Sequence, residues 1–171
     1  MKTFSRFSIL AVLLVAFAGS AVAVEYNFNA LVDIVEGITV TETTPLNFGV
    51  LVKNDGEVIV AADGAVTNDD ALIIDDTNIS QGIFTVDSAP GADLQIACVA
   101  GTPVDGLALT DFTASWDGGA EAPAETGTPA LHTIVLASVS LEIGATLTVT
   151  KADVEVADNV QIPYTMEVVF Q

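Results

Sequence analysis

The residues best suited to chemistry are scarce in this 171-residue chain, which has one histidine, His132, and one cysteine, Cys98. Nucleophilic catalysis would need His132 close to Cys98 or to a serine, and no G-x-S-x-G motif frames a serine. A zinc site would need several His or Cys ligands. We therefore expect no catalytic residues, no zinc site and no cofactor, and a structural or surface role for His132 at the start of a strand.

The 23 carboxylates offer two other chemistries. A glycosidase needs two carboxylates about 5–10 Å apart beside sugar-stacking aromatics, but only one tryptophan and two tyrosines are available. Calcium prefers oxygen ligands, and the pairs Asp69-Asp70 and Asp75-Asp76 flank a short apolar run. If that run is extended, the pairs lie roughly 15–20 Å apart and cannot share one ion. We expect solvated turns here rather than a metal site.

The single cysteine also excludes an intrachain disulfide. In the stretch DLQIAC, Leu94, Ile96 and Cys98 alternate with Asp93, Gln95 and Ala97. An extended strand directs alternate side chains to opposite faces. The pattern therefore predicts a Cys98 thiol on the apolar face, where it acts as a small hydrophobic group.

The first 23 residues have the pattern of a secretory signal peptide. Lys2 and Arg6 precede an apolar run from Phe7 to Phe17, and Ala21-Val22-Ala23 forms an A-x-A cleavage site. The apolar run is shorter than the roughly 20 residues of a membrane anchor. We expect residues 1–23 to be removed and residues 24–171 to form one exported domain that does not span the membrane.

The mature chain is strongly acidic, because only Lys53 and Lys151 remain against 23 acidic residues, a formal charge of −21. Binding to nucleic acid or to an anionic membrane depends on Lys and Arg that neutralise phosphates. Both are therefore poor partners, and we expect no binding to nucleic acid. Such charge is typical of proteins that stay soluble at high density or in salty water.

Apolar and polar residues alternate through most of the chain, and four Asp-Gly pairs supply the positive φ angles of tight hairpin turns. The clearest alternation sets Leu141, Ile143, Ala145, Leu147 and Val149 against polar or small residues, which predicts a strand with one buried and one wet face. The fold class predicted is all-β, an antiparallel sandwich of about 8 to 10 strands. Strands are expected at residues 37–41, 48–52, 57–61, 71–74, 83–86, 94–99, 112–116, 133–139, 141–150 and 164–170, with residues 118–130 as a surface loop.

Several ordered stretches resemble domain-of-unknown-function family 4402: TPLNFGVLV, GEVIVAADG, GIFTVDSAPGADLQI, LEIGATLTV and IPYTMEVVF. The resemblance implies a secreted bacterial immunoglobulin-like sandwich, similar to spore-coat U and archaic chaperone-usher pilin domains, with no catalytic residues. This chain differs from the family at Pro163, where the family usually has Gly. It also has the single Cys98, where pilin-like relatives have paired Cys. Because proline lacks a backbone donor, Pro163 is expected at a strand start or an edge.

The stretch VEYNFNALVDI, residues 24–34, is a regular strand next to the cleavage site. Two interpretations remain open. The strand either pairs within its own sandwich, which we favour for the isolated fold, or is donated to a second copy, as in a fibre subunit. Donation would place alternate side chains in pockets of the neighbour. These strand-exchange residues are Tyr26, Phe28, Ala30, Val32 and Ile34.

The function expected is that of a non-enzymatic, exported structural protein, a fimbria-like or coat subunit at the cell surface. Its partners would be further copies of itself and a periplasmic chaperone. Its location would be extracellular, on the cell surface or in the periplasm of a Gram-negative bacterium. The alternative is a stand-alone secreted binding or adhesion module that acts through its loops, including residues 118–130.

Overall fold

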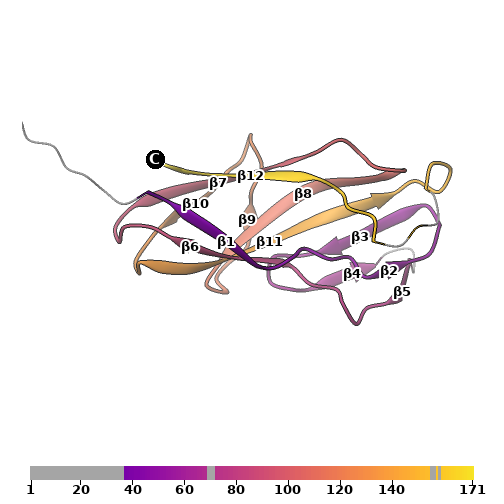
Figure 1. Cartoon of the computed structure of the whole chain (residues 1–171), viewed down its shortest axis with the longest axis horizontal. Helices are drawn as coiled ribbons and strands as arrows, with labels where there is room; N and C mark the ends of the chain where they lie inside the picture. The colour runs from indigo at the N-terminus through magenta and orange to yellow at the C-terminus, as the bar shows by residue number, and fades with distance from the viewer. Residues whose placement is uncertain (1–36, 69–71, 155–156, 158) are drawn as a thin grey trace, which may run out of the picture. The chain divides into compact units, whose positions relative to one another are not determined.

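The computed structural model describes residues 37–68, 72–154, 157 and 159–171. These residues contain no helix, and hence none long and apolar enough to cross a membrane. The signal peptide and the strand predicted at residues 1–23 and 24–34 lie outside the described residues. Figure 1 shows the strands, which are β1 (Thr39–Thr44), β2 (Val50–Leu51), β3 (Gly56–Val60), β4 (Val66–Asn68), β5 (Ile73–Asp75), β6 (Gly82–Asp87), β7 (Asp93–Ala100), β8 (Leu107–Trp116), β9 (Ala122–Pro123), β10 (Ala130–Thr133), β11 (Ser138–Val149) and β12 (Tyr164–Phe170).

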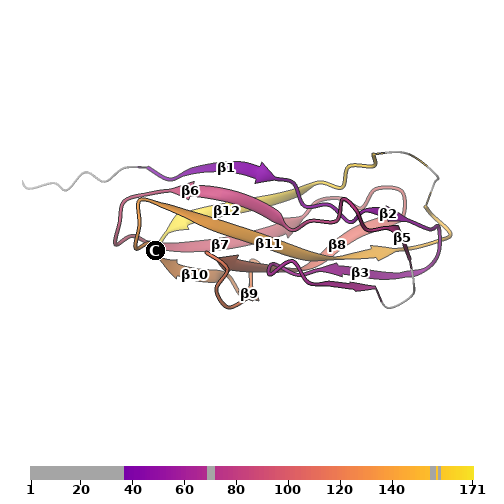
Figure 2. The same ribbon diagram turned by 90° about the horizontal axis from the view of Figure 1, so that it is seen from below.

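The long strand β11 organises the larger of two main sheets (Figures 1 and 2). Along one side of β11, β6 pairs with its first half and β3 with its second half, while β8 pairs along the other side. Strands β1, β4 and β9 extend this sheet beyond β6, β3 and β8. The second sheet has the order β10-β7-β12, and β2 pairs with β5 alone. Every one of these pairs is antiparallel.

The apolar rows of the two sheets form one hydrophobic core. Leu141 and Ile143 of β11 and Leu94 and Ile96 of β7 are fully buried in the same cluster. Each such side chain stabilises the fold by about 1.5–3 kcal/mol through burial. The prediction of an all-β antiparallel sandwich is confirmed. The larger strand number includes β4 and β9, which were not predicted and which, at three and two residues, leave little periodicity in the sequence.

Two of the Asp-Gly pairs form the predicted tight turns. Asp105 and Gly106 have φ angles of 47° and 74°, and Asp117 and Gly118 have 49° and 68°. Positive φ at both central residues is the mark of a type I′ turn, whose twist matches that of the flanking strands.

The strand predicted at residues 112–116 begins five residues earlier, at Leu107. Asp111 has a positive φ of 47°, and the pairing of β8 with β11 shifts register there. This bulge changes the parity of the buried positions, which are odd before it, as at Leu109, and even after it, as at Phe112 and Ala114. The alternation is therefore interrupted in the sequence although the strand continues.

The strand predicted at residues 133–139 is wrong, because β10 ends at Thr133. Residues 134–137 connect β10 to β11, and Ile134 exchanges backbone hydrogen bonds with the β6–β7 connection at Gly91 (2.7 Å) and Ala92 (2.8 Å). The prediction that β11 has one wet face is also wrong at its middle. Gly144 and Thr146 on that face are buried, the first against the backbone of residues 60–62.

The Cys98 thiol lies in the core, as predicted, with 3% of the residue exposed. Burial raises the pKa of the thiol from 9.0 to about 12. As the pH rises from 9 to 12, the unfolded chain loses the thiol proton while the folded chain keeps it, so this group lowers stability with increasing pH.

We expect Cys98→Ala to make alkaline unfolding less steep. Between pH 9 and 12 the loss of the thiol should reduce the pH dependence of the unfolding free energy by about 1.4 kcal/mol per pH unit. Urea unfolding at several pH values measures this slope. An unchanged slope would mean that Cys98 ionises in the folded chain.

Candidate functional site

One side of the sandwich is closed by the segment between β8 and β10. Ala124 is completely buried, donates its backbone N–H to the carbonyl of Phe112 in β8 (2.9 Å) and accepts the N–H of Cys98 in β7 (2.7 Å). It thus joins the two sheets. Residues 118–130 are therefore not simply the surface loop that their composition predicts, since they also include β9.

The opposite side of the sandwich is bounded by β12, which pairs only with β7 among the described strands. The N–H of Gly101 donates to Pro163 (2.8 Å) and that of Gln171 to Asp93 (2.9 Å), so the odd-numbered residues at both ends of β12 bond to β7. Backbone groups of an antiparallel strand alternate between its two sides. The even-numbered residues, Tyr164 to Phe170, therefore direct their N–H and C=O groups toward the free edge.

The inward side chains along this edge are only half covered. Ile162, Tyr164, Met166 and Val168 pack on the core but remain partly exposed, whereas the matching row of β7 is buried. An exposed sheet edge with an apolar row accepts an additional strand. Pro163 precedes the first residue of this edge strand, as the sequence predicts.

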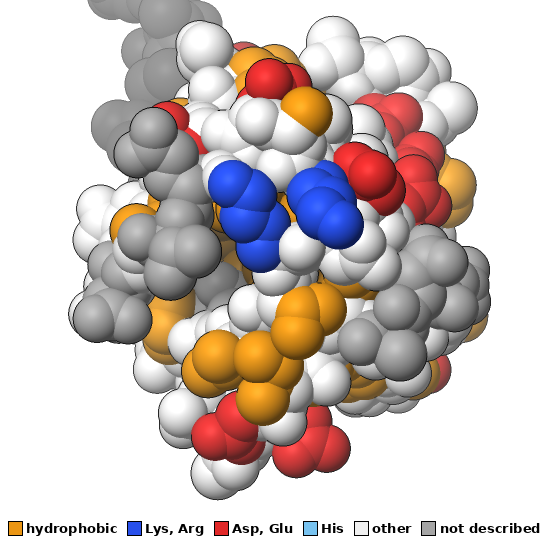
Figure 3. Space-filling model, turned by 90° about the vertical axis from the view of Figure 1, so that its right-hand side faces the viewer, with side chains coloured by type: hydrophobic (Ala, Val, Ile, Leu, Met, Phe, Trp, Pro, Cys, Tyr) orange, Lys and Arg blue, Asp and Glu red, His pale blue; other side chains and the backbone are white. Residues whose placement is uncertain are grey.

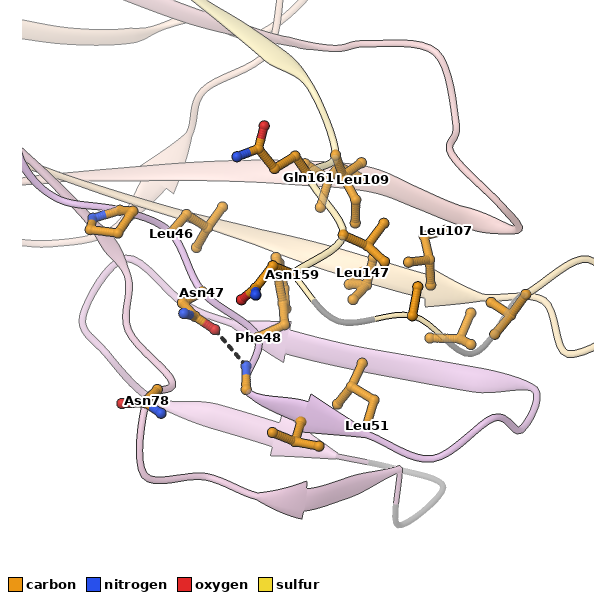
Figure 4. Close-up of a pocket in the computed structure, with 18 of the residues that line it drawn as sticks. Leu46, Asn47, Phe48, Leu51, Asn78, Leu107, Leu109, Leu147, Asn159 and Gln161 are labelled. Atoms are coloured by element: carbon orange, nitrogen blue, oxygen red, sulfur yellow. Dashed lines mark hydrogen bonds between the residues drawn. The ribbon is translucent and has the colours of Figure 1, made fainter.

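A groove of about 720 Å³ lies at the start of this edge (Figure 4). One wall is the stretch from Pro45 to Lys53, and the other is the segment that leads into β12. The side chains at its base come from core strands and are mainly leucine and valine, as the close-up shows. They are Leu107 and Leu109 of β8 and Leu147 of β11 (Figure 4), and Val149 of β11 and Val154, which follows that strand, also line the groove.

Hydrogen bonds fix the first wall of the groove. The backbone groups of Asn47 and Ser80 exchange two hydrogen bonds (2.9 and 3.0 Å), and the Ser80 hydroxyl donates to the carbonyl of Pro45 (2.8 Å). The Asn47 side chain accepts the N–H of Gly49 at 2.8 Å (Figure 4). The wall is therefore held in place independently of any occupant of the groove.

Tyr164 connects the groove to the neighbouring strand β1. Its ring lies 5.6 Å from that of Phe112, and burial together with the charge of Glu42 in β1 and the Cys98 thiol raises its pKa to about 12. The influence of Glu42 indicates that β1 and β12 face each other across the open side.

We expect Glu42→Gln to lower the pKa of Tyr164, which should still remain above 10 because burial is the main cause of the shift. Tyrosinate absorbance in a Tyr26→Phe background measures this titration. Glu57→Gln, on β3, is the matched control and should leave the titration unchanged. Equal effects of the two variants would contradict the placement of β1 beside β12.

The residues considered for catalysis are not brought together. His132 is half-buried in β10, stacks on Trp116 with a centroid distance of 4.5 Å, and pairs with Leu94. Cys98 lies four residues further along β7, about 13 Å away in an extended strand. This separation excludes a Cys-His pair in the described fold.

Carboxylates do not form a metal cluster in the part of the chain that the structure describes. Asp75 accepts hydrogen bonds from the N–H and hydroxyl of Thr77, which lower its pKa. Asp76 follows in the same turn, as expected for a solvated turn. Asp69 and Asp70 lie outside the described residues.

The strand-exchange residues predicted from the sequence lie outside the described residues. The edge and groove that could receive them were missed by sequence reasoning. A signal was present, because Ile162, Tyr164, Met166 and Val168 alternate as a buried row should. Nothing in the sequence showed that this row borders the open side of the sandwich.

Comparison with known families gives one match, to the family described as Domain of unknown function (DUF4402), over residues 38–164. The chain belongs to this family. The matched region runs from just before β1 to the first residue of β12, so it includes both walls of the groove. No curated protein and no solved structure matches the chain.

Proposed function

We propose that the protein is a non-enzymatic structural subunit of an exported, fimbria-like or coat-like assembly at the bacterial cell surface. Its subunits are joined when a strand from one copy is added to the free edge of β12 in another. The observation that supports this proposal is the half-covered apolar row that continues into the groove along an edge where β12 pairs with no other described strand.

The segment at residues 24–34 has the properties of such a strand. Its 11 residues would extend about 36 Å, which matches the length of the 12-residue β11 along which the sandwich is built. Its alternate apolar side chains would lie beside the partly exposed row of β12 and face the core. Backbone hydrogen bonds to β12 would supply the affinity. The pockets of the receiving copy that hold the apolar side chains would supply the specificity.

The direction of the added strand favours exchange between copies. β1 begins beside Asp87 and Ser138, at the end of the sandwich opposite the groove. A segment that folds back from β1 onto its own β12 would run parallel to it. A segment from a second copy can run antiparallel, which is the arrangement of every strand pair in the two sheets.

Removal of the segment tests the proposal. Residues 24–171 are expected to form concentration-dependent oligomers, and residues 37–171 to form a monomer that is stabilised by an added peptide of residues 24–36. Sedimentation velocity and thermal unfolding measure both. A monomeric parent whose truncated form unfolds and ignores the peptide would contradict strand exchange.

A second candidate is a stand-alone binding module. Val135 and Leu136 are 76% and 64% exposed on a connection held by the hydrogen bonds of Ile134, so they form a fixed apolar tip. Exposed apolar residues of this kind mark contact sites. If Val135→Ser and Leu136→Ser abolish binding to a surface while removal of residues 24–36 leaves it unchanged, this candidate replaces the first.

A further inference from the structure

The two lysines of residues 24–171 lie together at the end of the sandwich that contains the groove. Lys53 belongs to the groove wall, and the backbone N–H of Lys151 donates to Asp55, two residues from Lys53, at 2.7 Å. Figure 3 shows the two lysine side chains next to each other at this end of the molecule, beside an apolar patch and with acidic side chains around them. All basic residues of the mature chain are thus concentrated at one place.

From this arrangement, which rests on the proposed function, we infer that Lys53 and Lys151 receive Asp33 and Glu36 of a second copy. An antiparallel strand along β12 would place residue 24 near Phe170 and residue 34 at the groove. The acidic residues Asp33 and Glu36 would then arrive at the groove mouth. The lysines fix both the direction of the strand and the head-to-tail order of the copies.

The same contact is out of reach within one chain. Asp33 lies six residues before Thr39, so it can be at most about 20 Å from the start of β1. The lysines lie beyond Val149, at the other end of the 12-residue β11, about 36 Å from that start. Only a second copy can bring these charges together.

Lys53 and Lys151 also reduce the electrostatic repulsion that opposes association of the copies. Each mature copy has a formal charge of −21, so most contacts between copies bring like charges together. The lysine pair is the place where an acidic segment is attracted rather than repelled. Complementary charge of this kind controls the rate and the orientation of association more than its strength.

A charge-matched pair of variants of the mature chain tests the inference. Lys53→Gln with Lys151→Gln and, as the control, Thr128→Asp with Ser138→Asp at exposed positions each make the net charge more negative by two. We expect association to weaken about tenfold in the first variant and less than about twofold in the control. Sedimentation velocity at low salt measures both, and circular dichroism verifies their folds.

A second experiment exchanges the signs of the charges on the two sides of the proposed contact. A mixture of Lys53→Glu/Lys151→Glu with Asp33→Lys/Glu36→Lys should associate, whereas the Lys53→Glu/Lys151→Glu chain alone should not. If the wild-type chain associates and both glutamine and control variants weaken it equally, the lysine contact is wrong and strand exchange stands. If the wild-type chain remains monomeric at all concentrations, the proposed function itself is wrong.

Discussion

Gly144→Ala is expected to destabilise the sandwich by about 3 kcal/mol or more, because the added methyl group has no space. A Cβ atom at residue 144 would collide with backbone atoms at Val60, Ala61 and Ala62. Gly144 lies where the pairing of β11 passes from β6 to β3, so the neighbouring backbone cannot move without breaking one of the two ladders. Chemical denaturation measures the change.

Gly127→Ala is the matched control for this substitution. Gly127 is exposed, and a Cβ atom there would have nothing within 4 Å. Its replacement should change the unfolding free energy by no more than about 0.5 kcal/mol. If Gly144→Ala is equally mild, β3 and β6 do not meet at β11 as the structure places them.

Phe28→Asp in the chain of residues 24–171 is expected to weaken the proposed assembly at least about 100-fold, because it would place an ionised carboxylate against the apolar row of β12. Asn29→Asp adds the same charge to the next residue, whose side chain would face away from the core in an extended strand. It should have only a small effect. Concentration-dependent sedimentation of the two variants measures the difference.

An equal loss of assembly in the Phe28→Asp and Asn29→Asp variants would contradict a strand with one buried face. An effect of Asn29→Asp alone would mean that the register is shifted by one residue, which exchanges the two faces. The comparison therefore tests the alternation of residues 24–34 independently of the truncation experiment.

Regular alternation allowed much of the fold to be predicted. The strands around Cys98 and Leu141 obey a period of two over six residues or more, and each was correctly placed on the core. The prediction failed where local geometry breaks the period. The positive φ at Asp111 inserts one residue into β8, and the tip at Val135 continues an apolar pattern after β10 has ended.

The open side of the sandwich could not be predicted, because it depends on which strands become neighbours. The sequence around Ala124 has no periodicity, yet this residue closes one side by bonding to both sheets. The row that begins at Ile162 has clear periodicity, yet it borders an edge that no other described strand covers. Local patterns report which face of a strand is apolar, and only the topology determines whether that face is fully covered.

Binding of a peptide of residues 24–36 to the chain of residues 37–171 tests strand addition most directly. Apolar side chains that face the core lie opposite the even-numbered residues of β12, so the N–H groups of Phe28 and Ala30 should bond to that edge. We predict that N-methylation of Phe28 and Ala30 abolishes binding, while N-methylation of Asn27 and Asn29 leaves most of it. Isothermal titration calorimetry that finds the four methylated positions equivalent, or no binding of the unmodified peptide to the folded domain, would contradict strand addition at β12.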